Sequence, residues 1–164
     1  MYTLRKIDDF TEKIKEHILK YPNAYKFPNN DTTNKDFHIS QGYTLFEVLD
    51  SNSNIVGFVL LKLLRPAKFH YNPEYEIIVG TFNKHRILYN ILNLILHKFP
   101  NTNFIATIRK SNDNHAIQYI SNILCEAGFN QEGSDPTTDI SFAYNTDPSI
   151  NPKNFINFKR EQCF

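Results

Sequence analysis

The order of patterns between residues 75 and 129 constrains the fold of this 164-residue chain more than any other feature. Residues 74–80 form a run rich in β-branched and aromatic side chains that ends in a glycine, as expected for a buried strand. A basic turn at 81–86 follows, and apolar side chains then recur at helical spacing over residues 87–99. This half of the segment therefore predicts a strand, a turn and an amphipathic helix.

A second strand and helix follow in the same segment. Residues 103–108 are strand-like, and the polar residues 111–113 offer several oxygens that could cap a helix. Gly128 stands where a left-handed C-cap residue belongs, and Phe129 is placed to fold back onto the last turn. The residues expected on the buried face of this helix are Ala116, Tyr119, Ile120, Ile123, Leu124 and Ala127.

Composition and charge narrow the class of protein. A chain of this length suits one domain with a full core, and 41% hydrophobic with 14% aromatic residues argues against disorder. A formal net charge of +1 gives no long-range field for nucleic acid. No apolar run approaches the roughly 18 residues that cross a bilayer, and the N-terminus lacks the apolar core of a signal peptide. We therefore expect no nucleic-acid or membrane partner, and a cytoplasmic location.

The cysteines and histidines indicate neither a disulfide framework nor a metal site. Cys125 lies on the second predicted helix and Cys163 lies in the tail, so the two thiols are well separated. Cys125 is expected to be a small buried side chain. None of the six histidines has ligand spacing to a second His, Cys or carboxylate, and we expect no metal.

Patterns outside the central segment predict further elements around it. Residues 9–19 look like a helix, and Asp9 and Glu12 have the spacing of a capping box. Two strand-like runs joined by a polar turn predict an antiparallel hairpin in the middle of the chain. The strands expected outside the central segment are 2–7, 43–49, 55–64 and 139–144.

Together these elements resemble the Gcn5-related N-acetyltransferase family, whose members move an acetyl or other acyl group from coenzyme A to an amine. The resemblance covers most of the chain and implies an α/β fold with a mixed, mostly antiparallel central sheet flanked by helices. It implies one domain over residues 1–144, in a monomer or homodimer. Residues 145–164 are expected to pack on this domain or at a subunit contact. Residues 21–42 correspond to the family segment that helps shape the acceptor site.

The resemblance implies an acyl-coenzyme A dependent N-acyltransferase. Its co-substrate would be acetyl-coenzyme A, and its acceptor a primary amine of a small molecule, an amino sugar or a protein. The alternative is a catalytically inactive binding module of the same fold that holds a protein or small-molecule partner. The turn at 83–88 discriminates between the two. Amides that point into an open cleft would allow coenzyme A to bind, whereas Leu88 or Arg86 filling that space would exclude it.

The family's best signature is a Gln/Arg-x-x-Gly-x-Gly/Ala turn at a helix start, where backbone amides and the helix dipole hold the pyrophosphate. Aligning on Ile91-Leu92 puts Asn83 at its first position and puts Arg86 and Leu88 where glycines are expected. The side chains of Lys84, His85 and Arg86 could hold phosphates in place of the backbone amides that the glycines would expose. The alternative is a solvated basic turn. The cofactor-binding residues implied here are Val79, Gly80, Asn83, Lys84, His85, Arg86, Ile87 and Leu88.

A second family marker is Asn-x-x-Ala, whose Asn contacts the pantetheine arm, followed by a Tyr that can protonate the leaving thiolate. The residues implied for the arm are Asn112, Asp113 and Asn114, of which Asp113 stands three before Ala116. Tyr119 is the candidate acid, and the alternative is a packed aromatic side chain with a satisfied hydroxyl. The family's usual Tyr position, four before the Gly-Phe pair, is occupied by Leu124.

The family often uses a Glu on the strand before the pyrophosphate turn to deprotonate the amine, because a lone pair must be freed before attack. Glu76 lies on that strand, and Glu74 points to the same face if the strand is regular. The alternative is a pair of solvent-facing carboxylates. A backbone amide near Val79 or Gly80 would stabilise the oxyanion, where the family splays its two central strands.

Overall fold

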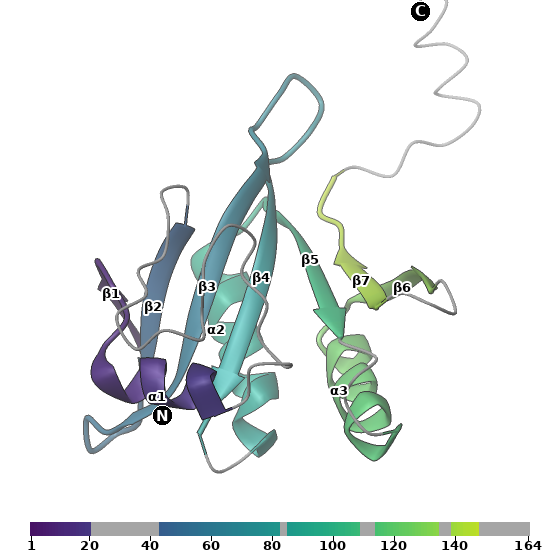
Figure 1. The fold of residues 1–164 in the computed structure, drawn as a ribbon. Coiled ribbons are helices and arrows are strands. Elements are labelled where there is room, and N and C mark those ends of the chain that lie inside the picture. Colours follow the sequence, from purple (N-terminus) through teal and green to yellow (C-terminus); the bar gives the residue numbers. More distant parts are fainter. Residues whose placement is uncertain (21–42, 83–84, 109–113, 135–138, 148–164) are drawn as a thin grey trace, which may run out of the picture.

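The computed structural model describes residues 1–20, 43–82, 85–108, 114–134 and 139–147. Seven strands in this part form one sheet in the order β1-β2-β3-β4-β5-β7-β6 (Figure 1). Only the β4–β5 pair is parallel, so the predicted mixed, mostly antiparallel sheet is confirmed. The strands are β1 (Thr3–Ile7), β2 (Tyr43–Leu49), β3 (Ile55–Arg65), β4 (Glu74–Thr81), β5 (Asn103–Ile108), β6 (Asn130–Ser134) and β7 (Ile140–Tyr144).

Helices cover both faces of the sheet. The helix α1 (Glu12–Lys20) buries Ile14 and Ile18 in a cluster whose other members are Phe10, Leu45, Phe58, Leu60 and Phe82. On the opposite face, α2 (Leu88–Lys98) and α3 (Asn114–Glu126) contribute to a larger cluster that includes Val59, Ile77, Ile91, Leu92, Ile95, Phe104, Ile123 and Leu124. We call these the α1 face and the α2 face. A short 3-10 helix, η1 (His85–Ile87), leads into α2.

The end of α3 confirms the predicted glycine cap. Gly128 has φ of 101°, in the left-handed region that favours glycine. Its N–H donates to the carbonyl of Cys125, and the N–H of Phe129 donates to that of Leu124, which is the Schellman pattern. The ring of Phe129 is buried on the α2 face, so the cap also returns the chain to the core.

Two local expectations were wrong. The helix α1 begins at Glu12 and not at Asp9. Asp9 therefore does not stand at the N-cap position that a capping box requires, and its carboxylate accepts a hydrogen bond from the N–H of Phe10 at 2.8 Å. The strand β6 was missed because its residues, Asn-Gln-Glu-Gly-Ser, have low strand propensity and pair only through β7.

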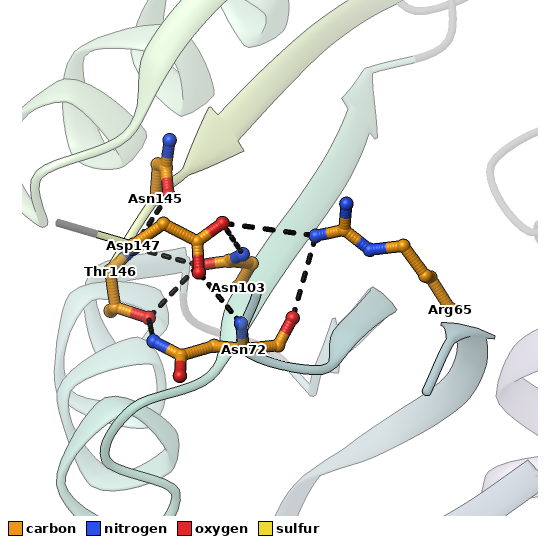
Figure 2. Close-up of polar contacts among 6 residues, drawn as sticks. All are labelled: Arg65, Asn72, Asn103, Asn145, Thr146 and Asp147. Carbon is orange, nitrogen blue, oxygen red and sulfur yellow. Dashed lines mark hydrogen bonds and ion pairs between the residues drawn. The ribbon is translucent and has the colours of Figure 1, made fainter. Parts of the chain in front are cut away.

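A polar network ties the base of the β3–β4 hairpin to β5 and to the segment after β7 (Figure 2). The buried Asn103 side chain donates to the Asp147 carboxylate at 3.0 Å and accepts from the N–H and hydroxyl of Thr146 at 2.7 and 2.9 Å. The N–H of Asn72 donates to Asp147 at 2.7 Å, and Arg65 lies 3.9 Å from the same carboxylate. Thr146 and Asp147 therefore pack on the domain. Residues 148–164 and 21–42 lie outside the described residues.

Candidate active site

The two central strands separate along their length (Figure 1). The β4–β5 ladder contains only the pairs Glu74↔Asn103, Tyr75↔Phe104 and Glu76↔Ile105. Beyond Glu76, β4 continues to Thr81 and β5 continues to Ile108 without further pairing between them. The result is a fork that opens toward the carboxyl ends of two parallel strands.

The hydrogen-bond pattern shows which backbone groups of β4 line this fork. The carbonyl of Pro73 accepts from the N–H of Asn103 on the β5 side, and the N–H of Phe82 donates to Val56 on the β3 side. Backbone groups of a strand alternate between its two neighbours with a period of two. Odd-numbered residues of β4 therefore present their N–H and C=O toward β5. Val79 is such a residue and lies three positions past the last β4–β5 pair.

Gly80 has a different role. It lies directly opposite Phe58 on β3, and a Cβ added at Gly80 would lie 2.0 Å from that ring. Its even number directs its own N–H toward β3, in the paired ladder. Of the two amides predicted for the oxyanion, the geometry therefore places Val79 at the fork. Gly80 is needed because the buried Phe58 ring packs across the strand.

Glu76 lies at the apex of the fork, in the last β4–β5 pair, and Glu74 lies two residues earlier. Both side chains point to the α1 face, because the intervening odd residues pack on the α2 face. Both are partly buried, and within the described residues neither makes a hydrogen bond or an ion pair. Lys62, opposite Glu76 on β3, instead holds its ammonium 5.6 Å from the centre of the Tyr43 ring.

The N-terminus of α2 follows the end of β4 at the mouth of the fork. The N-cap residue Ile87 makes no side-chain hydrogen bond to the first turn, and that turn contains no acidic residue. Ile87 and Leu88 are buried in the α2-face core, whereas Arg86 is exposed. The end of β5 leads in the same way toward α3.

Solved structures of several N-acetyltransferases are similar to this one. No protein-family profile and no curated protein matches the sequence. One similar structure is a protein assigned provisionally as a phosphinothricin N-acetyltransferase, with a TM-score of 0.57, 14% identity and coverage of 90% of this chain and 100% of that one. Ribosomal-protein-S5-alanine acetyltransferase from Vibrio fischeri gives 0.54 at 15% identity, covering 92% and 96%. The spermidine/spermine N-acetyltransferase SpeG from Vibrio cholerae gives 0.52 at 15% identity, covering 96% and 99%.

The chain has the Gcn5-related N-acetyltransferase fold. Within this acetyltransferase fold, the resemblance inferred from the sequence is confirmed at the level of architecture. Sequence identities of 14–15% support a shared fold but do not indicate a shared substrate.

Several predicted residues of the acetyltransferase site fall outside the described residues. They are Asn83, Lys84, Asn112 and Asp113. His85 is the first residue of η1 and Asn114 is the first residue of α3, and the structure describes only their backbones. The sequence predicted both helices, but it could not locate the point where β4 and β5 part.

Two side chains of α3 differ from the expected burial. Tyr119 is 43% exposed and does not belong to the buried face, which is formed by Ile123 and Leu124 with partly buried neighbours. Cys125 is exposed and not a small core residue. The α3 spacing predicted the buried stripe, but the stripe is narrower than we expected. Within the described residues, no group of His, Cys, Asp and Glu could hold a metal ion, and no helix is long and apolar enough to cross a membrane.

Proposed function

We propose that this protein is an acetyl-coenzyme A dependent N-acyltransferase that acetylates a primary amine. The observation that carries this proposal is the fork between β4 and β5, with Val79 on its open edge, Glu76 at its apex and the N-terminus of α2 at its mouth. An extended thioester arm needs a channel with backbone donors along one side, and an unpaired strand edge provides them.

The residues at the mouth suit the phosphates of coenzyme A. The first N–H groups of α2 lack a side-chain cap, and the turn has no carboxylate that would repel an anion. The exposed Arg86 adds a fixed positive charge beside this helix end. We assign η1, the first turn of α2 and Arg86 to phosphate binding, and Val79 to the acyl end of the arm. Bound acetyl-coenzyme A would supply the thioester that the acceptor amine attacks.

Glu76 is the proposed general base. An ammonium must lose a proton before its nitrogen can attack a carbonyl, and a carboxylate at the apex of the fork can hold that proton. The N–H of Val79 would donate to the oxygen that becomes negative during attack. A general base typically accelerates a reaction by roughly 10²- to 10⁴-fold. One donor to the oxyanion typically contributes roughly 10²- to 10³-fold. Protonation of the leaving thiolate by Tyr119 stays a prediction.

The acceptor is not specified by the fold. The similar structures carry names that refer to phosphinothricin, to spermidine and to a ribosomal protein, which are chemically different amines. We propose a primary amine that enters from the α1 face, since the Glu76 side chain points there. A small molecule, an amino sugar and a protein amine all meet this requirement.

Calorimetric titration with acetyl-coenzyme A tests the proposal. We expect micromolar binding that Arg86→Glu weakens by about 10- to 100-fold, since one charged hydrogen bond to a phosphate contributes roughly 1.5–3 kcal/mol. Lys6→Glu is the matched control, because it makes the same change of charge on β1, an edge strand that β2 and β3 separate from β4. No heat and no thermal shift at millimolar ligand would overturn the proposal and favour the non-catalytic binding module.

A further inference from the structure

The hairpin that joins β3 to β4 projects beyond the rest of the sheet (Figure 1). The last β2–β3 pair is Tyr43↔Lys62, and the β4–β5 ladder begins at Glu74. Residues 66–73 therefore lie past the last pairs that β3 makes with β2 and that β4 makes with β5. They lie at the opposite end of β4 from the mouth of the fork, so a role for this hairpin does not depend on the proposed activity.

The projection has a defined structure. Lys68 and Tyr71 exchange two backbone hydrogen bonds of 3.0 and 2.8 Å, which closes a two-residue turn at Phe69 and His70. His70 has φ of 76°, and its ring lies 4.0 Å from that of Phe69. At the base, Asn72 is held by Thr146 and Asp147 (Figure 2). The tip is thus presented by a closed turn on an anchored hairpin.

This tip exposes apolar side chains on all sides. Phe69 at the apex is 85% exposed, Tyr71 is 51% exposed, and Leu63 and Leu64 are each 45% exposed. Leu63 lies opposite Tyr75 and so shares the α2 face, whereas Tyr71 lies under the guanidinium of Arg65, which is on the α1 face opposite Glu74. A groove on a partner protein would cover apolar side chains on one face of the hairpin only. The apolar interior of a bilayer would contact the hairpin on both faces.

The charge at the tip itself is positive. Residues 62–73 contain Lys62, Arg65 and Lys68 and no Asp or Glu. At the base of the hairpin, Arg65 lies 3.9 Å from Asp147 and opposite Glu74, and Lys62 lies opposite Glu76, so Lys68 beside the turn sets the charge of the tip. Two copies meeting tip to tip would oppose their lysines, and the segment 148–164 is itself net positive. The charges therefore favour an anionic partner. Aliphatic leucines, which cannot stack on bases, favour lipid over nucleic acid.

We propose that the β3–β4 hairpin is a membrane-surface anchor that inserts Phe69 and its apolar neighbours into a bilayer containing anionic lipids. Lys68 and Arg65 would reach the headgroups while the apolar side chains enter the acyl boundary. Our expectation of no membrane partner considered only spanning segments, and a peripheral contact needs none. Such an anchor would hold the fork away from the lipid, because the two lie at opposite ends of β4.

The chain contains no tryptophan, so Phe69→Trp introduces a single reporter at the tip. Mixed with vesicles of phosphatidylcholine and phosphatidylserine, this variant is expected to shift its emission to shorter wavelength and to be quenched by brominated acyl chains. Tyr89→Trp is the matched control on α2, where Tyr89 is also exposed, and should do neither. Vesicles of pure phosphatidylcholine separate apolar insertion from attraction to anionic headgroups. The protein should bind these vesicles more weakly and with less dependence on salt.

Vesicle flotation of the full chain supplies the second measurement. Phe69→Ser should lower the partition coefficient by about 10- to 100-fold, because the apolar surface of the Phe ring would no longer be removed from water. The fold should be unaffected, since Phe69 is 85% exposed. Failure of the wild type to float with anionic vesicles would overturn the proposal. Flotation without a change in the Phe69→Trp emission would also overturn it, as would an emission shift produced only by an acidic peptide or single-stranded RNA.

Discussion

Gly80 shows how one residue of β4 is fixed by packing. Its position opposite the fully buried Phe58 leaves no room for a Cβ. Gly80→Ala should therefore destabilise the protein by about 2–3 kcal/mol, as overpacking in a close-packed core does. Urea unfolding measures this loss, and Phe58→Leu in the same chain should recover part of it. Equal stability of Gly80→Ala and the wild type would show that the ring can move aside.

A second prediction at a single residue concerns Glu76, the proposed general base. Glu76→Gln should reduce kcat for acetyl transfer by about 10²- to 10⁴-fold, because the amide cannot take the proton from the acceptor. Binding of acetyl-coenzyme A should change little. Free-thiol release from acetyl-coenzyme A measures the rate. Glu74→Gln is the control on the same face, and a larger loss there than at Glu76 would move the base to Glu74.

The role of a single residue could be predicted from the sequence where local backbone conformation determines it, and not where packing against distant segments does. Gly128 could be predicted because only its local backbone conformation matters. Tyr119 could not, because helical spacing gives the direction of a side chain but not the width of the neighbouring core. The assignment of Val79 over Gly80 needed hydrogen bonds at both ends of β4.

Among the elements, the turn between β2 and β3 carries a dependence on pH. The Asp50 carboxylate accepts from the N–H groups of Asn54 and Asn52, each at 2.9 Å. The hydrogen bond from Asn54, followed by smaller contributions including that from Asn52, lowers the pKa of Asp50 below its ordinary value of 3.8. A lowered pKa in the folded state contributes stability that is fully present well above pH 3.8. This contribution is lost as the pH falls through the folded value.

Asp50→Asn tests this turn. The variant should be less stable than the wild type at neutral pH, and the difference should shrink as the pH falls below 3.8. Thermal unfolding of both proteins across this range measures it, with Asp8→Asn as an exposed control. A difference that stays constant with pH would mean that the carboxylate charge does not stabilise the turn.

The elements were predictable where their own residues determine them. The hairpin of β2 and β3 and the order β4, α2, β5, α3 follow from periodicity and turn residues. The strand β6 exists because β7 offers it a partner. This tertiary pairing is not visible in the hydrophobic pattern of residues 130–134.

At the scale of the whole molecule, the fork depends on contacts between distant segments. Its apex is set by where the β4–β5 register ends, and the sequence pattern of either strand does not contain that information. The closed end of the fork is held by residues from β3, β5 and the chain after β7. A family resemblance could therefore predict that the strands splay, but not the residue at which they do so.

Asn103 is the centre of this closed end and gives the last prediction. Its side chain is buried and makes three hydrogen bonds to Thr146 and Asp147. Asn103→Ala should lower the free energy of unfolding by about 2–4 kcal/mol, because it removes these bonds and leaves the N–H of the partly buried Thr146 without its acceptor. Asn145→Ala removes one exposed bond to Asp147 and should cost less than about 1 kcal/mol. Because the network joins three segments, the loss should appear as one cooperative shift in urea unfolding. Equal losses in the two variants would mean that the network does not hold β5 to the rest of the sheet.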